Sequence, residues 1–167
     1  MHTAARSLRA LALLILASLA MACGDALAAS SACRNLVYGD QGVARKDYLP
    51  CAGEMMAALD ELDTQTAAAF TGDAQARANG QASLRKVQAL MQAAGGRKLL
   101  ERWSDRRLTD LNVDINNALT HYQAFYMVRI IDEPDPRAAV TRQAAEAELR
   151  GAERRYNEAR DSYRQLR

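Results

Sequence analysis

Two stretches of the chain place apolar residues at alternating intervals of three and four, and this spacing constrains the fold more than any other feature. Residues at such intervals lie on one face of an α-helix. No run of alternating Val, Ile or Thr indicates a strand, so we predict an all-α fold. The apolar positions are Leu108, Leu111, Ile115, Ala118, Tyr122 and Phe125 in the first stretch, and Leu149, Ala152, Tyr156, Ala159, Tyr163 and Leu166 in the second.

Turn-forming residues divide the rest of the chain into further helices. Shorter apolar stripes predict one helix that ends at Gly72 and another that starts after Asp73, a good N-cap residue. The glycine pair at 95–96 ends this second helix, and the third would span 97–131. A break near Ser104, which could cap a separate helix, is the alternative to one continuous third helix.

Two prolines join the third helix to the last one. Pro134 disfavours helix at the residue before it, and Asp135 followed by Pro136 is typical of a helix start. A short turn makes two long helices antiparallel neighbours, and counting outward from Pro134 places Leu149 near Leu119. We predict an antiparallel helical bundle of about four helices, dominated by this long C-terminal hairpin with its coiled-coil spacing. If the hairpin outreaches the shorter helices, its uncovered end would serve a partner or self-association.

The first 28 residues have the pattern of an export signal rather than of a folded element. Arg6 and Arg9 precede an apolar run over 10–22, which is the length of a signal-peptide core and shorter than the ~20 residues of a spanning helix. Cleavage after Ala28 fits the small-x-small rule of ordinary signal peptidase. We therefore expect a signal peptide over 1–28 and an address in the bacterial periplasm.

A second cleavage site competes with the first. The residues Leu19-Ala20-Met21-Ala22-Cys23 resemble the lipobox of bacterial lipoproteins, in which the cysteine is acylated before cleavage. Met21 and Ala20 depart from the preferred order of the motif. The resemblance implies lipidation at Cys23 and, because no Asp follows the cysteine, an anchor in the outer membrane.

The cysteines agree with an oxidising compartment. Acylation would use Cys23 and cleavage after Ala28 would remove it, so either route leaves Cys33 and Cys51 as a pair. We predict a disulfide between them, which would close a loop of about 18 residues and stabilise the fold by roughly 3 kcal/mol. Residues 29–50 would then be an irregular N-terminal arm stapled to a helical bundle over 51–167.

The three aromatic residues Tyr122, Tyr126 and Tyr156 and the neighbouring His121 form the candidate ligand site. Facing helices of a bundle can enclose a pocket, and these residues would line it if His121 turned inward. A haem bound through His121 lacks a second convergent ligand, so we expect no cofactor and no metal.

A basic cluster lies near one end of the third predicted helix, at Arg97, Lys98, Arg102, Arg106 and Arg107. It could contact anionic lipid headgroups, or it could be a solvated face paired to the interspersed Glu101, Asp105 and Asp110. The formal net charge of +2 excludes a strongly basic nucleic-acid binder, and the cluster is not a basic strip interleaved with aromatic residues, as nucleic-acid binding would favour.

Motifs of the common enzyme classes are absent from the sequence, so we expect a non-enzymatic protein. The main hypothesis is an exported bacterial envelope protein that binds another protein or the envelope surface through its helix faces. The alternative is a helical bundle that binds a small ligand or cofactor in a pocket between helices.

Overall fold

The computed structural model describes residues 31–128 and 135–167. The signal peptide over 1–28 and the candidate lipidation site Cys23 therefore lie outside the described residues. Within the described ranges the chain is helical without a named strand, which confirms the all-α prediction. The helices are α2 (Ser31–Arg34), α3 (Arg45–Phe70), α4 (Ala74–Ala93), the 3-10 helix η2 (Gly96–Leu100), α5 (Arg106–Met127) and α6 (Ala138–Leu166).

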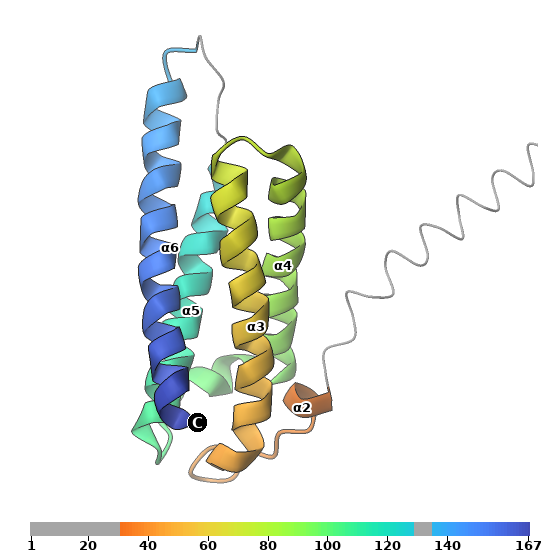
Figure 1. Cartoon of the computed structure of the whole chain (residues 1–167). Helices are drawn as coiled ribbons and strands as arrows, with labels where there is room; N and C mark the ends of the chain where they lie inside the picture. The colour runs from red at the N-terminus through yellow and green to blue at the C-terminus, as the bar shows by residue number, and fades with distance from the viewer. Residues whose placement is uncertain (1–30, 129–134) are drawn as a thin grey trace, which may run out of the picture.

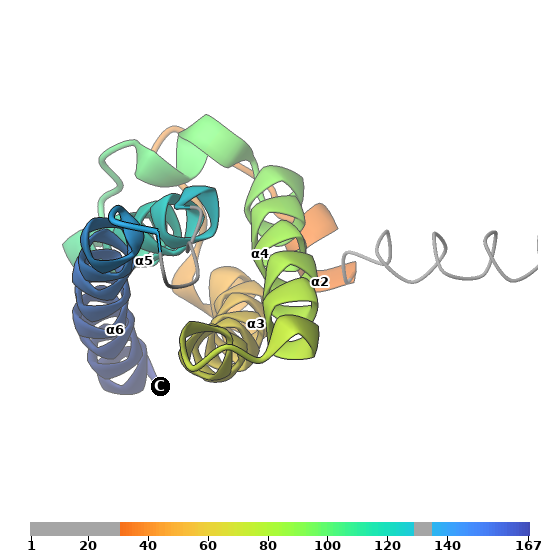
Figure 2. The ribbon, with the colours of Figure 1, turned by 90° about the horizontal axis from the view of Figure 1, so that it is seen from above.

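Four long helices lie side by side and alternate in direction (Figure 1). Seen along their length, α3 lies beside α4 and α5 beside α6, and α3 also contacts α6 (Figure 2). The longest, α6, has 29 residues and is therefore about 43 Å long. Its first turns extend beyond the ends of α3 and α4, whereas α2, η2 and the C-terminus lie at the opposite end (Figure 1).

The predicted apolar stripes form the interior face of their helices. All six stripe positions of α5 are fully buried. In α6 the stripe is buried at every position except Tyr163, which is partly exposed and packs against the core. Alanines supply two of the six positions of the α6 stripe, and most of the large side chains that are fully buried come from α3 and α5. The fully buried large residues of these two helices are Tyr48, Met55, Leu59, Leu62, Leu108, Leu111, Asn112, Ile115, Tyr122 and Phe125.

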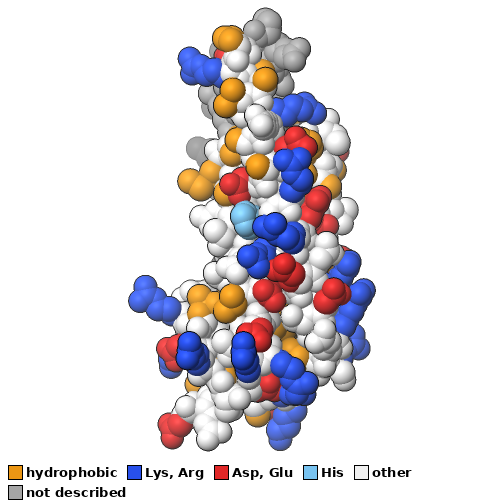
Figure 3. All heavy atoms as spheres, turned by 90° about the vertical axis from the view of Figure 1, so that its left-hand side faces the viewer, with side chains coloured by type: hydrophobic (Ala, Val, Ile, Leu, Met, Phe, Trp, Pro, Cys, Tyr) orange, Lys and Arg blue, Asp and Glu red, His pale blue; other side chains and the backbone are white. Residues whose placement is uncertain are grey.

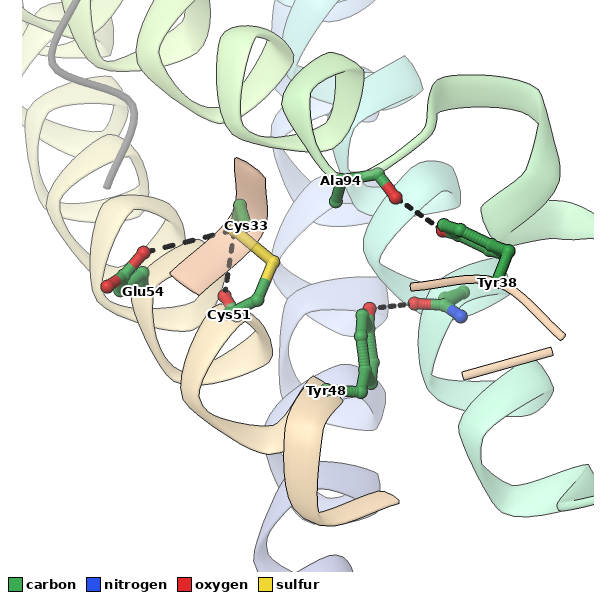
Figure 4. Close-up of a disulfide and its surroundings, with 7 residues drawn as sticks. Cys33, Tyr38, Tyr48, Cys51, Glu54 and Ala94 are labelled. Atoms are coloured by element: carbon green, nitrogen blue, oxygen red, sulfur yellow. Dashed lines mark hydrogen bonds between the residues drawn. A yellow bond between two sulfur atoms is a disulfide. The ribbon is translucent and has the colours of Figure 1, made fainter. Parts of the chain in front are cut away.

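A disulfide joins the N-terminal arm to the first long helix, as predicted. The Sγ atoms of Cys33 and Cys51 are bonded, and both residues are fully buried between α2 and α3 (Figure 4). The arm is shorter than predicted, however, because α3 begins at Arg45 instead of Cys51. Pro50 removes one helical hydrogen bond, but Tyr48 and Cys51 are buried on the same side of the helix. Their burial keeps these first turns helical.

The third predicted helix is broken, so of the two alternatives the break near Ser104 is the one observed. The glycines at 95 and 96 adopt φ values of 117° and 55°, which end α4 and lead into η2. Asp105, rather than Ser104, caps α5, because its Oδ1 accepts a hydrogen bond of 3.1 Å from the backbone N–H of Arg107. The helix ends at Met127, and residues 129–131 of the predicted span lie outside the described ranges.

The register between α5 and α6 differs from the predicted one by about one helical turn. His121 contacts Glu148 and Gly151, and Asp114 accepts a hydrogen bond from Ser162. The count outward from Pro134 assumed helices that reach the turn on both sides. Instead α5 stops at Met127 and α6 begins at Ala138, so the connection is not symmetric about the proline.

Candidate functional site

The three tyrosines of the predicted ligand site all point their hydroxyls at α3. Tyr122 donates to Asp63 at 2.6 Å, and Tyr156 donates to Asp60 at 2.5 Å. Tyr126 lies 3.0 Å from the hydroxyl of Thr66. Because Thr66 donates its own proton to the carbonyl of Leu62, it must accept the one from Tyr126. The structure thus places the hydroxyls of all three tyrosines against the same neighbouring helix, α3.

Burial keeps these hydroxyls protonated. Burial first, and then the hydrogen bond to Asp63, raise the pKa of Tyr122 far above its ordinary value. The same two causes, with Asp60 as the acceptor, raise the pKa of Tyr156 to about 12. Burial also raises the pKa of Tyr126, although the bond to Thr66 opposes it. At neutral pH these side chains therefore act as hydrogen-bond donors that join helices, and a general base is not among them.

His121 does not join this tyrosine cluster. Its Nδ1 lies 2.8 Å from Oε2 of Glu148 on α6, and the side chain is 35% exposed. Its ring lies against Gly151, where any side chain would collide with it. The four residues of the predicted ligand site are therefore divided: three face α3, and the fourth lies between α5 and α6 near the surface.

The sequence analysis did not identify the residues that accept hydrogen bonds from the tyrosine hydroxyls. They are Asp60, Asp63 and Thr66, which follow one another at intervals of three along α3. A signal was present in the sequence, because the apolar stripe of this helix is interrupted between Leu62 and Phe70, and Thr66 occupies the missing position. A buried polar residue inside an apolar stripe implies a polar partner on another helix.

The predicted basic cluster lies at the end of the molecule that also carries α2. We call Arg97, Lys98, Arg102, Arg106 and Arg107 the basic end; all five are exposed. They lie on η2, on the loop after it and on the first turn of α5. A hollow of about 440 Å³ opens among them, lined by Arg102, Trp103, Arg106, Thr109 and Asp110.

Trp103 holds the loop of the basic end in place. Its indole Nε1–H donates to the carbonyl of Lys98 at 3.0 Å, and its ring packs edge-on against Tyr38 of the N-terminal segment and Tyr48 of α3. Gly42 of the N-terminal segment has a φ of 90° and approaches the indole so closely that a Cβ would lie 2.6 Å from the ring. Trp103 thus fixes the loop that carries Arg102 against the N-terminal segment and α3.

Only part of the basic end is paired to carboxylates. Asp105 forms an ion pair with Arg45, whose Nη2 lies 2.5 Å from its Oδ2. The Oδ1 of Asp105 lies 3.8 Å from Nε of Arg107. Burial works against ionisation here, but the hydrogen bond and charge of Arg45 lower the pKa of Asp105 below its ordinary value. Arg106 has a loose pair with Asp110 at 3.8 Å.

The remaining cations of the basic end have no carboxylate partner within residues 31–128 and 135–167. Among the residues that the structure describes, Arg97, Lys98 and Arg102 form no ion pair, although Lys98 lies over the ring of Tyr38. Leu100, between them in sequence, is 39% exposed. The surface therefore combines unpaired positive charge with an apolar side chain.

A second exposed apolar surface lies at the opposite end of the molecule. Val140 is 67% exposed in the first turns of α6, and Met127 at the end of α5 is 78% exposed. Ala144 and Ala147 are also exposed and follow Val140 at intervals of four and three, so the three side chains share one helix face. Figure 3 shows hydrophobic side chains toward the upper end of this side of the molecule and charges of both signs intermixed below them.

Within residues 31–128 and 135–167, no three potential His, Cys, Asp or Glu ligands converge on a metal-sized site. Across the same ranges, no helix has both the length and the apolar character needed to cross a membrane. Comparison of the chain with protein-family models, curated proteins and solved structures gives no match.

Proposed function

We propose that this chain is an exported bacterial envelope protein, an antiparallel helical bundle that binds another protein through the end of its C-terminal hairpin. Its leader over 1–28 is removed on export to the periplasm, either after Ala28 or before a lipidated Cys23 that anchors it to the outer membrane. The binding is non-enzymatic.

The single observation that carries this proposal is the exposed apolar face at the start of α6. Val140, Ala144 and Ala147 have the spacing by which one helix docks into the groove of another protein. Exposed valine and methionine side chains are worth roughly 1.5–3 kcal/mol each when a partner buries them fully. These three residues are exposed, and the first turns of α6 extend beyond the ends of α3 and α4 (Figure 1).

The engaged tyrosine hydroxyls support a surface function over a pocket. A ligand between the helices would have to displace the bonds from Tyr122 to Asp63 and from Tyr156 to Asp60. Each such bond to a carboxylate contributes about 1.5–3 kcal/mol. The binding of a small ligand between these helices would therefore first cost the free energy of two hydrogen bonds. The exposed face of α6 has no such hydrogen bonds to break.

Site-specific photo-crosslinking in the living bacterium tests the partner. A photoreactive amino acid at Val140 is expected to give one discrete adduct, and the matched position Val113, an exposed valine of α5, is expected to give none. A photoreactive group at Met127 should give the same adduct, and Val140→Asp should abolish it. An adduct with twice the mass of the chain would show that the partner is a second copy of this chain. Absence of any adduct at Val140 and Met127 would refute the proposal.

The processing of the leader has its own test. Incorporation of labelled palmitate that is lost in Cys23→Ala would establish the lipid anchor. A mature chain that begins at Ala29 and carries no lipid would instead establish ordinary cleavage. A mature chain that retains residues 1–28 would contradict both routes.

A further inference from the structure

We propose that the basic end is a membrane-contact surface that binds the anionic headgroups of phospholipids and orients the molecule on the bilayer. The proposal rests on the exported, membrane-facing location in the proposed function, but it concerns a different surface and a different kind of partner. The partner-binding face of α6 lies at the other end of the molecule (Figure 1).

Unpaired positive charge is the first argument. Arg97, Lys98 and Arg102 are exposed and have no ion pair within the described ranges, so their charge is available to an external anion. The side chain of Arg106 is 92% exposed and only loosely paired, and it adds to the same surface. Cations near an anionic leaflet are attracted over about a Debye length, which suits a cluster on one end of a rod.

The apolar residue among these cations is the second argument. Leu100 is 39% exposed between Lys98 and Arg102, and Val37 of the neighbouring N-terminal segment is 82% exposed. Basic residues that flank an exposed aliphatic side chain are the pattern of interfacial membrane contact, in which the cations bind headgroups and the aliphatic group enters the acyl boundary. An acidic protein partner would use the cations but gives no reason for this arrangement of leucine and charge.

The path of the chain is the third argument. The described chain begins at Ser31, at the same end as the basic cluster (Figure 1). Eight residue steps separate Cys23 from Ser31, which span at most about 28 Å when extended. A lipid on Cys23 would therefore keep the basic end close to the headgroups. The Cys33–Cys51 disulfide ties α2 to α3, so the tether pulls on the folded body directly (Figure 4).

Vesicle co-sedimentation tests the contact without the lipid anchor. The protein is the chain from Ala29 onward, which carries neither the leader nor Cys23, because Cys23→Ala in the full chain would itself block cleavage by the lipoprotein route. The probes are vesicles of equimolar phosphatidylglycerol and phosphatidylcholine, and vesicles of phosphatidylcholine alone. Binding is expected to the anionic vesicles only, and it should fall as salt rises.

Matched triple variants locate the surface. Arg97→Gln with Lys98→Gln and Arg102→Gln should lower the partition coefficient about 100-fold, because each cation near the surface contributes roughly a factor of five. The control neutralises three other exposed arginines, Arg85, Arg137 and Arg154, and gives the same net charge. It should lower partitioning less than about threefold, since these sites lie away from the basic end.

The outcomes separate the two proposals. No binding of the starting protein to anionic vesicles, or an equal loss in the control variant, would overturn the membrane contact and leave the α6 face untouched. Val140→Asp should bind vesicles normally. Leu100→Ser should weaken binding at high salt, where the apolar contribution remains. Circular dichroism and thermal melts of each variant confirm that the fold is unchanged.

Discussion

Replacing Gly80 by alanine tests whether ring packing, rather than helix propensity, selects this residue. Gly80 lies inside α4, where glycine costs about 1 kcal/mol relative to alanine. A Cβ on Gly80 would overlap the Oη of Tyr126 and lie 2.8 Å from its Cζ. The ring cannot retreat without losing its bond to Thr66. Overpacking costs about 1–3 kcal/mol and the lost bond about 1 kcal/mol, so we expect a net destabilisation of about 2 kcal/mol.

Urea denaturation of four chains measures the effect: the starting protein, Gly80→Ala, Tyr126→Ala and the double variant. Without the Tyr126 ring, the nearest neighbour of the added Cβ is the Cβ of Gln65 at 3.3 Å, so Gly80→Ala should then stabilise the fold by up to about 1 kcal/mol. The sign reverses between the two backgrounds, and the coupling energy is up to about 3 kcal/mol. If Gly80→Ala stabilises the starting protein as well, Tyr126 does not pack on Gly80 and the reasoning is wrong.

Three further predictions follow from single features of the structure. Replacing both Cys33 and Cys51 by alanine should lower the free energy of unfolding by about 3 kcal/mol, seen as a lower urea midpoint under oxidising conditions and no further effect of a reductant. Stability should be complete below pH 10 and fall as pH rises from 10 toward 12, because folding raises the pKa of Tyr38 and Tyr156 from 10.0 to about 12; an unchanged melting temperature across that range would contradict it. Gly42→Ala should cost about 2 kcal/mol or more, because its positive φ and the adjacent indole both exclude a side chain; near-ultraviolet dichroism of the indole and a urea titration would measure the change.

Local signals predicted the helices and the disulfide well. Asp73 caps α4 as expected, since its carboxylate accepts a hydrogen bond of 2.9 Å from the N–H of Ala76. The glycines at 95 and 96 end that helix with left-handed backbone angles. Such features depend on neighbours in the chain, so a single sequence contains what determines them. The pairing of Cys33 with Cys51 followed from counting alone.

Helix boundaries and register depended on contacts between distant segments. Nothing near Arg45 in sequence indicates that α3 starts there, because the first turns are stabilised by Tyr48 packing against Trp103 at 5.2 Å. The break before α5 likewise depends on the N-terminal segment, since Ser104 donates its N–H to the carbonyl of Gln41 at 3.2 Å. Tertiary contacts of this kind override local propensity and cannot be read from a periodic pattern.

The inward direction of the three candidate tyrosines was predicted, but their hydrogen-bond partners were not. The spacing of Tyr122, Tyr126 and Tyr156 placed them toward the interior, where they are found. Their partners depend on how α3 is rotated relative to α5 and α6, which the sequence of α5 and α6 does not specify. His121 lies apart from the tyrosines for a similar reason. One step along a helix turns a side chain by about 100°, so His121 and Tyr122 face different neighbours.

Several contacts between distant segments of this protein pair an aromatic ring with a glycine, and this limits where a ligand could bind. When a core contains few large side chains, few shape-matched contacts are available to fix the register between its helices. Five glycines provide such contacts, because each lies where the ring of another segment leaves no room for a Cβ. The pairs are Gly42 with Trp103, Gly53 with Tyr163, Gly80 with Tyr126, Gly95 with Tyr38, and Gly151 with His121. A ring that is held against a glycine cannot move aside to admit a ligand between the helices, so selection for binding would act on the two ends of the molecule, where the exposed face of α6 and the basic end lie.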